Sequence, residues 1–205
     1  MTGATPLEPV VLEGAHVRLE PLSHDHFEDL VEVALDPEIW RWTTERALSP
    51  EELRAWIDRA LAARATGTAM PFATVALPHG RAIGGTRFAT YSAADRRVEI
   101  GWTWIGRAWQ RTAVNTEAKY LMLRHAFETL GCIRVELRTD VLNDRSRAAI
   151  LRIGAKEEGI LRKHSLTANG RARDTIYYSI LDDEWPSVKA GLEGRLAASA
   201  PRTSA

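Results

Sequence analysis

One stretch of the chain, residues 98–119, determines two adjoining elements of the fold and the turn between them. Residues 98–105 alternate large apolar side chains with smaller or polar ones, which is typical of a β-strand. Residues 114–130 show the apolar spacing of an amphipathic helix, and Gly131 follows as a natural stop. Arg111 lies in the turn, next to a helix N-terminus whose unpaired N–H groups and partial positive charge suit a phosphate. On this stretch alone, an ordinary strand-to-helix connection is an equally good interpretation.

The other elements place this unit in a mixed α/β sheet. Strands are expected over residues 16–22, 71–77, 82–91, 96–105, 133–139, 160–167 and 171–180, the last two joined by an Asn169-Gly170 turn. Helices are expected after the caps Ser23 and Ser49, over residues 114–130, from Asn143 to Gly154 and from about Asp182. This order contains no repeat and no long linker, so we predict one domain over residues 1–196. Residues 197–205, rich in Ala and Ser, are expected to form a disordered tail.

Charge and composition exclude several classes of protein. The 27 basic and 27 acidic residues cancel, so no overall field favours nucleic acid as a partner. No stretch approaches the roughly 20 apolar residues that span a bilayer, and residues 1–9 lack the apolar run of a secretory signal. His24, Asp25 and His26 adjoin a helix start without further ligands, so no metal site is expected. We therefore expect a soluble cytoplasmic protein that binds neither nucleic acid nor membrane.

Five stretches, taken with the order of elements, resemble one known family. They are residues 17–22, 98–102, 109–119, 143–155 and 173–180. Together they resemble the GNAT superfamily of acyl-CoA-dependent N-acyltransferases, and most closely its branch of ribosomal-protein alanine acetyltransferases (RimJ/RimL-like). The resemblance covers residues 16–192. It implies a mixed, mostly antiparallel central sheet flanked by helices, with acetyl-CoA as co-substrate and no metal.

The resemblance implies that residues 110–115 hold the pyrophosphate of CoA. The family pattern begins with Gln or Arg and has Gly three residues later, followed by Gly or Ala two residues after that. Gln110 fits the first position, whereas Ala113 and Asn115 occupy the other two, although Gly would permit positive φ and close approach. The amide donors remain, so we expect phosphate binding to survive. The cofactor-binding residues implied in this way are Trp104, Ile105, Gln110, Arg111, Thr112, Ala113, Val114, Asn115, Thr116 and Asn143.

Two residues are candidates for catalysis. Glu99 lies among large apolar neighbours, which can raise the pKa of a carboxyl group and suit it to act as a general base. A solvent-facing Glu on an alternating strand is the competing interpretation. Many relatives carry a Tyr where this chain has Ile150, and the resemblance implies that Ser146 replaces it in protonating the departing thiolate. Otherwise Asn143 is only a helix cap and Ser146 a first-turn residue.

The acceptor site is predicted from aromatic and basic residues. Trp40 and Trp42 lie in a loop that the family uses as one wall, although core packing accounts for either equally well. Tyr91 is a further candidate, and an acidic acceptor could meet basic side chains, for each of which a solvated strand face is the alternative. These basic residues are Arg87, His164, Arg171 and Arg173.

Several functions therefore remain open. The acceptor is expected to be a small-molecule amine or a protein N-terminus, and the donor acetyl-CoA or a larger acyl-CoA such as succinyl-CoA. A catalytically silent CoA-binding sensor or interaction module is the alternative, favoured by Ala113, Asn115 and Ile150. The family analogy alone suggests a homodimer.

Overall fold

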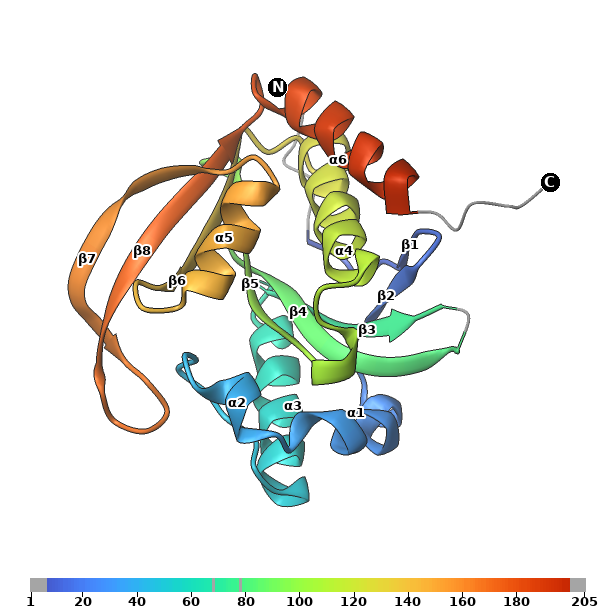
Figure 1. The fold of residues 1–205 in the computed structure, drawn as a ribbon, viewed down its shortest axis with the longest axis vertical. Coiled ribbons are helices and arrows are strands. Elements are labelled where there is room, and N and C mark those ends of the chain that lie inside the picture. Colours follow the sequence, from blue (N-terminus) through green and yellow to red (C-terminus); the bar gives the residue numbers. More distant parts are fainter. Residues whose placement is uncertain (1–6, 68, 78, 200–205) are drawn as a thin grey trace.

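A computed structural model describes residues 7–199 apart from residues 68 and 78, and in it eight strands form one sheet (Figure 1). The strand order is β1-β2-β3-β4-β5-β6-β8-β7, and only the β5–β6 pair is parallel. The predicted mixed, mostly antiparallel sheet is thereby confirmed. The strands are β1 (Leu12–Glu13), β2 (Val17–Pro21), β3 (Met70–Ala76), β4 (Arg81–Ser92), β5 (Arg97–Ile105), β6 (Arg134–Asp140), β7 (Lys156–Leu166) and β8 (Ala172–Leu181).

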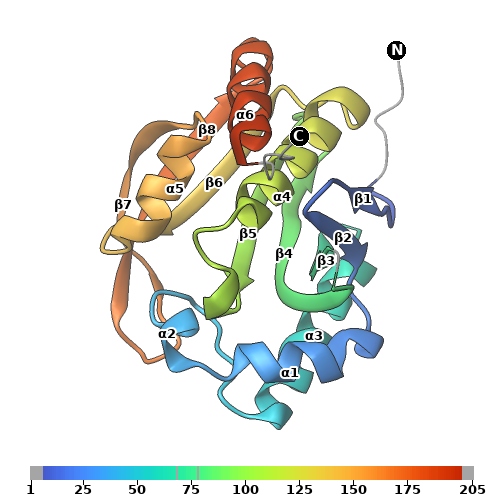
Figure 2. The same cartoon turned by 45° about the vertical axis from the view of Figure 1, so that its right-hand side comes forward.

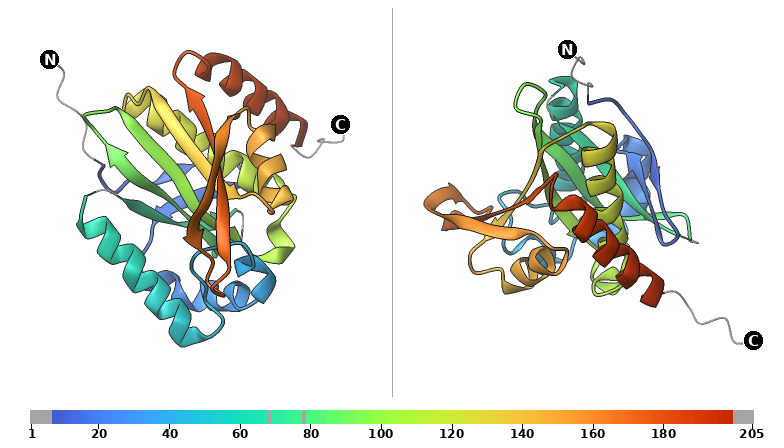
Figure 3. Two further views of the ribbon diagram at one scale, coloured as in Figure 1. Left: turned by 90° about the vertical axis from the view of Figure 1, so that its left-hand side faces the viewer. Right: turned by 90° about the horizontal axis from the view of Figure 1, so that it is seen from above.

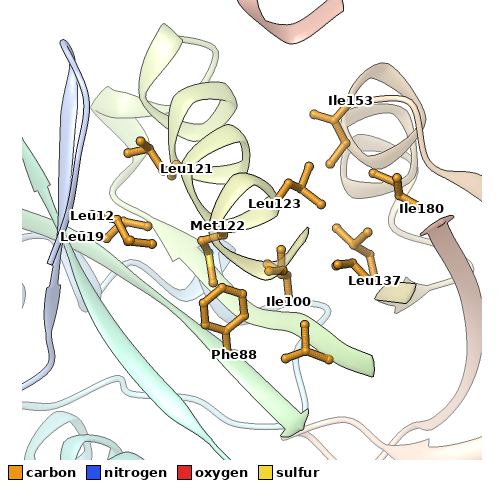
Figure 4. Close-up of a cluster of buried hydrophobic side chains, with 14 of the residues drawn as sticks. Leu12, Leu19, Phe88, Ile100, Leu121, Met122, Leu123, Leu137, Ile153 and Ile180 are labelled. Atoms are coloured by element: carbon orange, nitrogen blue, oxygen red, sulfur yellow. The ribbon is translucent and has the colours of Figure 1, made fainter. Parts of the chain in front are cut away.

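Helices cover both faces of the sheet and bury two separate apolar clusters. The α-helices are α1 (Phe27–Ala34), α2 (Pro37–Trp40), α3 (Pro50–Ala65), α4 (Ala113–Arg124), α5 (Asp144–Arg152) and α6 (Trp185–Ser199). The first three helices enclose one cluster against β3 and β4. Helix α4 packs over the other cluster, where Met122 lies above Phe88 (Figure 4). Helix α6 lies alongside α4 (Figure 2), and β7 and β8 form a long twisted ribbon at one edge of the sheet (Figure 3).

The predicted helix caps are confirmed. The Ser49 side chain accepts from the Glu52 amide at the start of α3, with Pro50 in the first turn. The Asn143 side chain likewise accepts from the Ser146 amide at the start of α5. Each cap satisfies an N–H group that the helix itself leaves unpaired, so the sequence positions of these starts are well determined.

Several elements differ from the sequence prediction. The strand β1 was not predicted, and it has only two residues. The short helix α2 was not predicted either; Asp36 caps it, and proline is compatible with its first turn. The helix predicted over 114–130 changes after α4 to a π-helical turn, His125–Thr129. The predicted tail is wrong for residues 197–199, which belong to α6, whereas residues 200–205 lie outside the described residues.

The parallel strands β5 and β6 separate after three residue pairs. The last pair in register is Glu99 with Glu136, beyond which β5 continues without β6 beside it. On its other side, β5 has a bulge opposite β4, where Trp102 has a φ of +49°. Such a φ is strained for a side chain of this size, and bulges re-aim the strand that carries them. The separation opens the sheet next to the N-terminus of α4.

One buried carboxylate ties α4 to the first hairpin. Glu117 accepts N–H bonds from Ala15, His16 and Val17, at 2.9, 2.6 and 2.8 Å. Gly14 leaves room for this, since a Cβ there would lie 2.4 Å from the Glu117 carboxyl carbon. The position of α4 relative to the sheet therefore depends on this carboxylate.

Within the part of the chain that the structure describes, none of the helices combines the length and apolar character needed to cross a bilayer.

We predict that Glu117→Gln lowers the free energy of unfolding by about 2 kcal/mol, because the amide replaces one of the two accepting oxygens with a donor. Equilibrium denaturation in urea measures the change. The control Glu13→Gln removes an exposed carboxylate that lies 3.9 Å from Arg18, and we expect it to alter stability by less than about 0.5 kcal/mol. An equal effect of both substitutions would contradict the anchoring role of Glu117.

Candidate functional site

A cavity of about 1040 Å³ lies where β5 and β6 separate. Its walls come from β5, the N-terminus of α4, helix α5, the loop between α2 and α3, and the β7–β8 ribbon. The tip of the ribbon lies beside the loop between α2 and α3 (Figure 2), and the Ala168 N–H donates to the Thr43 carbonyl oxygen at 3.0 Å. The cavity thus extends from a helix N-terminus to a separate end beneath the ribbon tip.

Most of the residues predicted for the site line this cavity. Four do not: the Val114 side chain is buried in the core, Tyr91 packs half-buried against the same core, and neither Arg87 nor Arg171 lines the cavity. Tyr91 therefore lies outside the acceptor wall for which it was predicted. The predicted residues that line the cavity are Trp40, Trp42, Glu99, Trp104, Ile105, Gln110, Arg111, Thr112, Ala113, Asn115, Thr116, Asn143, Ser146, His164 and Arg173.

The turn before α4 has the features of an anion site. Thr112 caps the helix, and Arg111 adopts a φ of +65°. Ala113 and Asn115 lie within the first turn of the helix without positive φ, so replacing glycine at these positions costs no backbone strain. The Asn115 Oδ1 atom is buried and has no hydrogen-bond partner among the described residues. Because buried polar atoms are nearly always paired, a ligand N–H or O–H group is expected to donate to this oxygen at the cavity wall.

Gln110 fixes the start of this turn through both ends of its side chain. Its Nε2 donates to the Ile105 carbonyl oxygen at 3.0 Å, and its Oε1 accepts from Arg145 at 2.6 Å. Arg145 and Arg152 of α5 also line the cavity, so its walls carry two arginines of α5 in addition to Arg111. Sequence reasoning did not single out either arginine for the site, because the approach of α5 to α4 is a tertiary feature.

Glu99 is buried in the cavity wall and paired with an arginine from the opposite strand. Its side chain is 3% exposed, and Arg138 of β6 donates from Nε to Oε1 at 2.7 Å. Arg138 also donates to the Tyr177 hydroxyl at 2.9 Å. Burial raises the pKa of Glu99, and the positive charge of Arg138 only partly offsets the effect. The solvent-facing alternative for Glu99 is therefore wrong.

Lys119 is a buried cavity residue that sequence reasoning missed. Its Nζ donates to the hydroxyls of Thr103 and Thr86, at 2.6 and 3.3 Å, and no carboxylate accepts from it among the described residues. Burial lowers the pKa of Lys119 from 10.5 to about 7. The spacing of Lys119 four residues after Asn115 was the available signal, because it places both on one helix face.

The two predicted tryptophans of the acceptor wall differ. Trp40 is packed in a buried aromatic cluster, with its ring centroid 5.2 Å from that of Trp104, and its Nε1 donates to the Ala34 carbonyl. Core packing thus accounts for Trp40. The half-buried Trp42 ring lies 5.0 Å and 5.6 Å from the guanidinium carbons of Arg41 and Arg171.

Asn143 and Ser146 line the cavity from the start of α5. The Asn143 Oδ1 accepts from the Ser146 N–H at 3.1 Å, so the cap interpretation of Asn143 is confirmed. Ile150 is buried one turn later on the same helix and also lines the cavity. On the face of α5 that lines the cavity, the Ser146 hydroxyl is thus the candidate proton donor, one turn before Ile150.

Comparisons with known proteins agree with this geometry. Residues 16–156 match the model of the acetyltransferase (GNAT) domain. The chain is 39% identical over 95 residues to the "Putative ribosomal N-acetyltransferase YdaF" of Bacillus subtilis, which covers 46% of this chain and 51% of that protein. The match with this relative thus spans about half of its length.

Solved structures resemble the whole fold. A GCN5-related N-acetyltransferase from Brucella melitensis has a TM-score of 0.89 and 30% identity, covering 100% of this chain and 92% of that one. Mycobacterium smegmatis RimJ, solved with CoA-disulfide, has a TM-score of 0.79 over 93% of this chain and 96% of that one. At 21% identity, this second likeness concerns the fold alone.

We predict that Lys119→Met raises the melting temperature by about 5 °C at pH 7. The folded chain holds the Lys119 pKa at about 7, so between pH 7 and 10.5 only the unfolded chain keeps the proton on this group. The stability of the unmodified protein should therefore rise with pH in that window, and the advantage of Lys119→Met should shrink. Thermal unfolding from pH 7 to pH 10 measures both trends, and a gain that is independent of pH would contradict the buried, neutralised amine.

Proposed function

The chain belongs to the GNAT acetyltransferase family, and on that premise we propose that it transfers an acetyl group from acetyl-CoA to a primary amine by direct attack in a ternary complex. The observation that carries the proposal is the cavity between β5 and β6, which joins a phosphate-type helix N-terminus to a buried carboxylate. The acceptor is a small-molecule amine or a protein N-terminus. The likeness to a ribosomal N-acetyltransferase of Bacillus subtilis favours the second.

The described residues fit the chemistry of CoA. The N-terminus of α4, together with Arg111 and Arg145, offers amide donors and cations for a pyrophosphate. The unpartnered Asn115 Oδ1 suits an N–H donor, and the pantetheine arm of CoA carries two amides. Along β5, the backbone beyond Glu99 has no β6 strand beside it, so N–H groups near Trp104 and Ile105 are available to polarise a carbonyl.

Glu99 removes the proton that the attacking amine must lose. The raised pKa makes the Glu99 carboxylate a stronger base, and Arg138 holds this carboxylate in one orientation. An intervening water can carry the proton from the amine to this carboxylate. The Ser146 hydroxyl protonates the departing thiolate from the opposite side of the gap.

Two observations favour a second candidate function. Ile150 occupies the position where many relatives have a tyrosine that protonates the departing thiolate. Ala113 and Asn115 depart from the glycine pattern of the loop. A catalytically silent CoA-binding sensor would need the helix N-terminus but no proton donor. A larger donor such as succinyl-CoA is a third candidate, since the cavity has a volume of about 1040 Å³.

We predict that acetyl-CoA binds with a Kd of the order of micromolar in calorimetric titration, and that Arg111→Gln weakens this binding about fivefold to tenfold. The control Arg124→Gln changes the other end of α4, outside the cavity, and should leave the affinity unchanged. Desulfo-CoA and succinyl-CoA are titrated in parallel. Tighter binding of succinyl-CoA would favour the larger donor, and no binding of any of the three would refute the acyltransferase proposal.

We predict that Glu99→Gln lowers kcat by about 100-fold while acetyl-CoA affinity is retained. In the unmodified enzyme, kcat/KM should rise with pH as Glu99 loses its proton, at a pKa above the usual 4.5, and the variant should lack this rise. Ser146→Ala should lower kcat about tenfold. Initial rates of acetyl transfer, measured over a range of pH, give kcat and kcat/KM for each variant.

The matched control is Glu136→Gln, which changes the register partner of Glu99 on β6 at a position outside the cavity lining. It should keep most of the activity. Activity in Glu99→Gln equal to that of the control would remove Glu99 from the mechanism, and absence of turnover in the unmodified protein with every amine tried would support the sensor.

A further inference from the structure

Strand β8 presents two buried polar side chains to the cavity without partners for all of their polar atoms. Arg173 and Thr175 are two residues apart, so both point to the same face of the strand, and both line the cavity. Their exposed fractions are 9% and 1%. Arg173 Nε and Thr175 Oγ1 have no hydrogen-bond partner within the described part of the chain. Buried polar groups in native proteins are nearly always paired, so these two indicate a missing ligand.

The carboxylates near Arg173 are already engaged by other groups. Asp140 pairs through Oδ2 with Arg171, and its Oδ1 accepts from the Leu142 N–H at 2.9 Å. Glu99 pairs with Arg138. Arg173 itself makes one long bond, from Nη1 to the Trp42 carbonyl oxygen at 3.4 Å. It is therefore a buried cation beside the cavity whose charge no carboxylate hydrogen bond neutralises among the described residues.

Glu45 does not supply the missing partner either. Its Oε1 accepts from Trp102 Nε1 at 3.2 Å, and its Oε2 lies 4.0 Å from Arg87 Nη2 and 4.0 Å from Arg59 Nη2. Glu45 Oε2 makes no hydrogen bond among the described residues, and no ion pair joins Glu45 to Arg173 in that part of the chain. Burial lowers the pKa of Arg173, and the negative charges of Asp140 and Glu99 only partly offset this effect.

We propose that Arg173 and Thr175 form an anion subsite for the acceptor, so that the substrate is a primary amine carrying a carboxylate a few bonds from its nitrogen. This rests on the proposed acetyl transfer. Arg173 touches the Trp42 loop, which walls the acceptor end, and it lies close enough to Glu99 for each charge to influence the other. The amine would face Glu99 while the anion faces β8.

The chemistry at β8 fits a carboxylate better than a phosphate. A guanidinium N–H and a neighbouring hydroxyl supply two donors, which match the two oxygens of a carboxylate. A single unmatched cation balances one negative charge, whereas a phosphate carries nearly two near neutral pH. The phosphates of CoA have their own site at the N-terminus of α4, which is built from Arg111 and backbone amides.

Two tests separate this subsite from the acetyl transfer on which it rests. The first uses binding alone: the monocarboxylate butyrate and the uncharged butyramide are titrated calorimetrically into the protein saturated with CoA. Butyrate should bind at least about tenfold more tightly than butyramide. Arg173→Gln should reduce this preference to about twofold or less. The control Arg162→Gln removes the same charge from an exposed β7 position outside the cavity and should preserve the preference.

The second test uses turnover with acceptors that differ in one carboxylate. The peptide amides Ala-Glu-Ala and Ala-Gln-Ala represent a protein N-terminus, and free glutamate and its diamide represent a small amine. In at least one pair, kcat/KM should favour the acid about tenfold, and Arg173→Gln should remove this preference. The favoured pair identifies the source of the carboxylate.

Each outcome decides one of the two proposals. Equal binding of butyrate and butyramide by the unmodified protein, or a preference that survives Arg173→Gln, overturns the subsite. Acetyl transfer to amines without preference for an acid also overturns the subsite and leaves the acetyl transfer intact. Arg173-dependent butyrate binding without transfer to any acceptor supports the anion subsite and refutes the acetyltransferase. If Arg173→Gln fails to fold, Thr175→Val is used, and the preference of the unmodified protein for butyrate still decides.

Discussion

The separation of β5 from β6 is the constraint on which the site depends. Two parallel strands that stay paired leave no space between them, and here the pairing stops at Glu99 and Glu136. The bulge at Trp102 turns β5 away, and Gly84 of β4 allows the close approach, because a Cβ there would lie 2.2 Å from the Trp104 carbonyl oxygen. The opened sheet leaves backbone N–H and C=O groups of β5 unpaired by β6, whereas a continuous sheet would pair them in interstrand hydrogen bonds.

An opened sheet needs support from its surroundings, and α4 provides it. Helix α4 packs on the apolar cluster of one sheet face, while Glu117 anchors it to the hairpin of β1 and β2. Lys119 reaches from the same helix to Thr86 of β4 and Thr103 of β5, on either side of the bulge. The helix N-terminus is thus held beside the gap by contacts made farther along α4. The N-terminus of α4 and the gap therefore keep a constant relation to each other.

Buried charges around the cavity differ in how they are balanced, and the differences are informative. Glu99 has Arg138, Asp140 has Arg171, and Glu117 has three backbone amides. These groups are satisfied and therefore hold the architecture. Other polar atoms of cavity-lining residues lack a hydrogen-bond partner among the described residues, namely Glu45 Oε2, Trp104 Nε1, Asn115 Oδ1, Arg173 Nε and Thr175 Oγ1. A folded protein retains such costly groups where something else binds to them, so they mark where ligands are expected at both ends of the cavity.

The sequence by itself determined the elements and their starts, because caps and apolar periodicity are local properties of the chain. Ser49, Thr112 and Asn143 begin their helices through bonds that span two or three residues. The position of Glu99 on an apolar strand, and the placement of Arg111 before a helix, were readable in the same way. Only the tertiary structure decided that Glu99 pairs with Arg138, that Arg145 binds Gln110 in the turn before α4, and that Tyr91 lies outside the cavity. These facts depend on where β5 leaves β6 and on which segments meet across long sequence separations, and no local pattern carries that information.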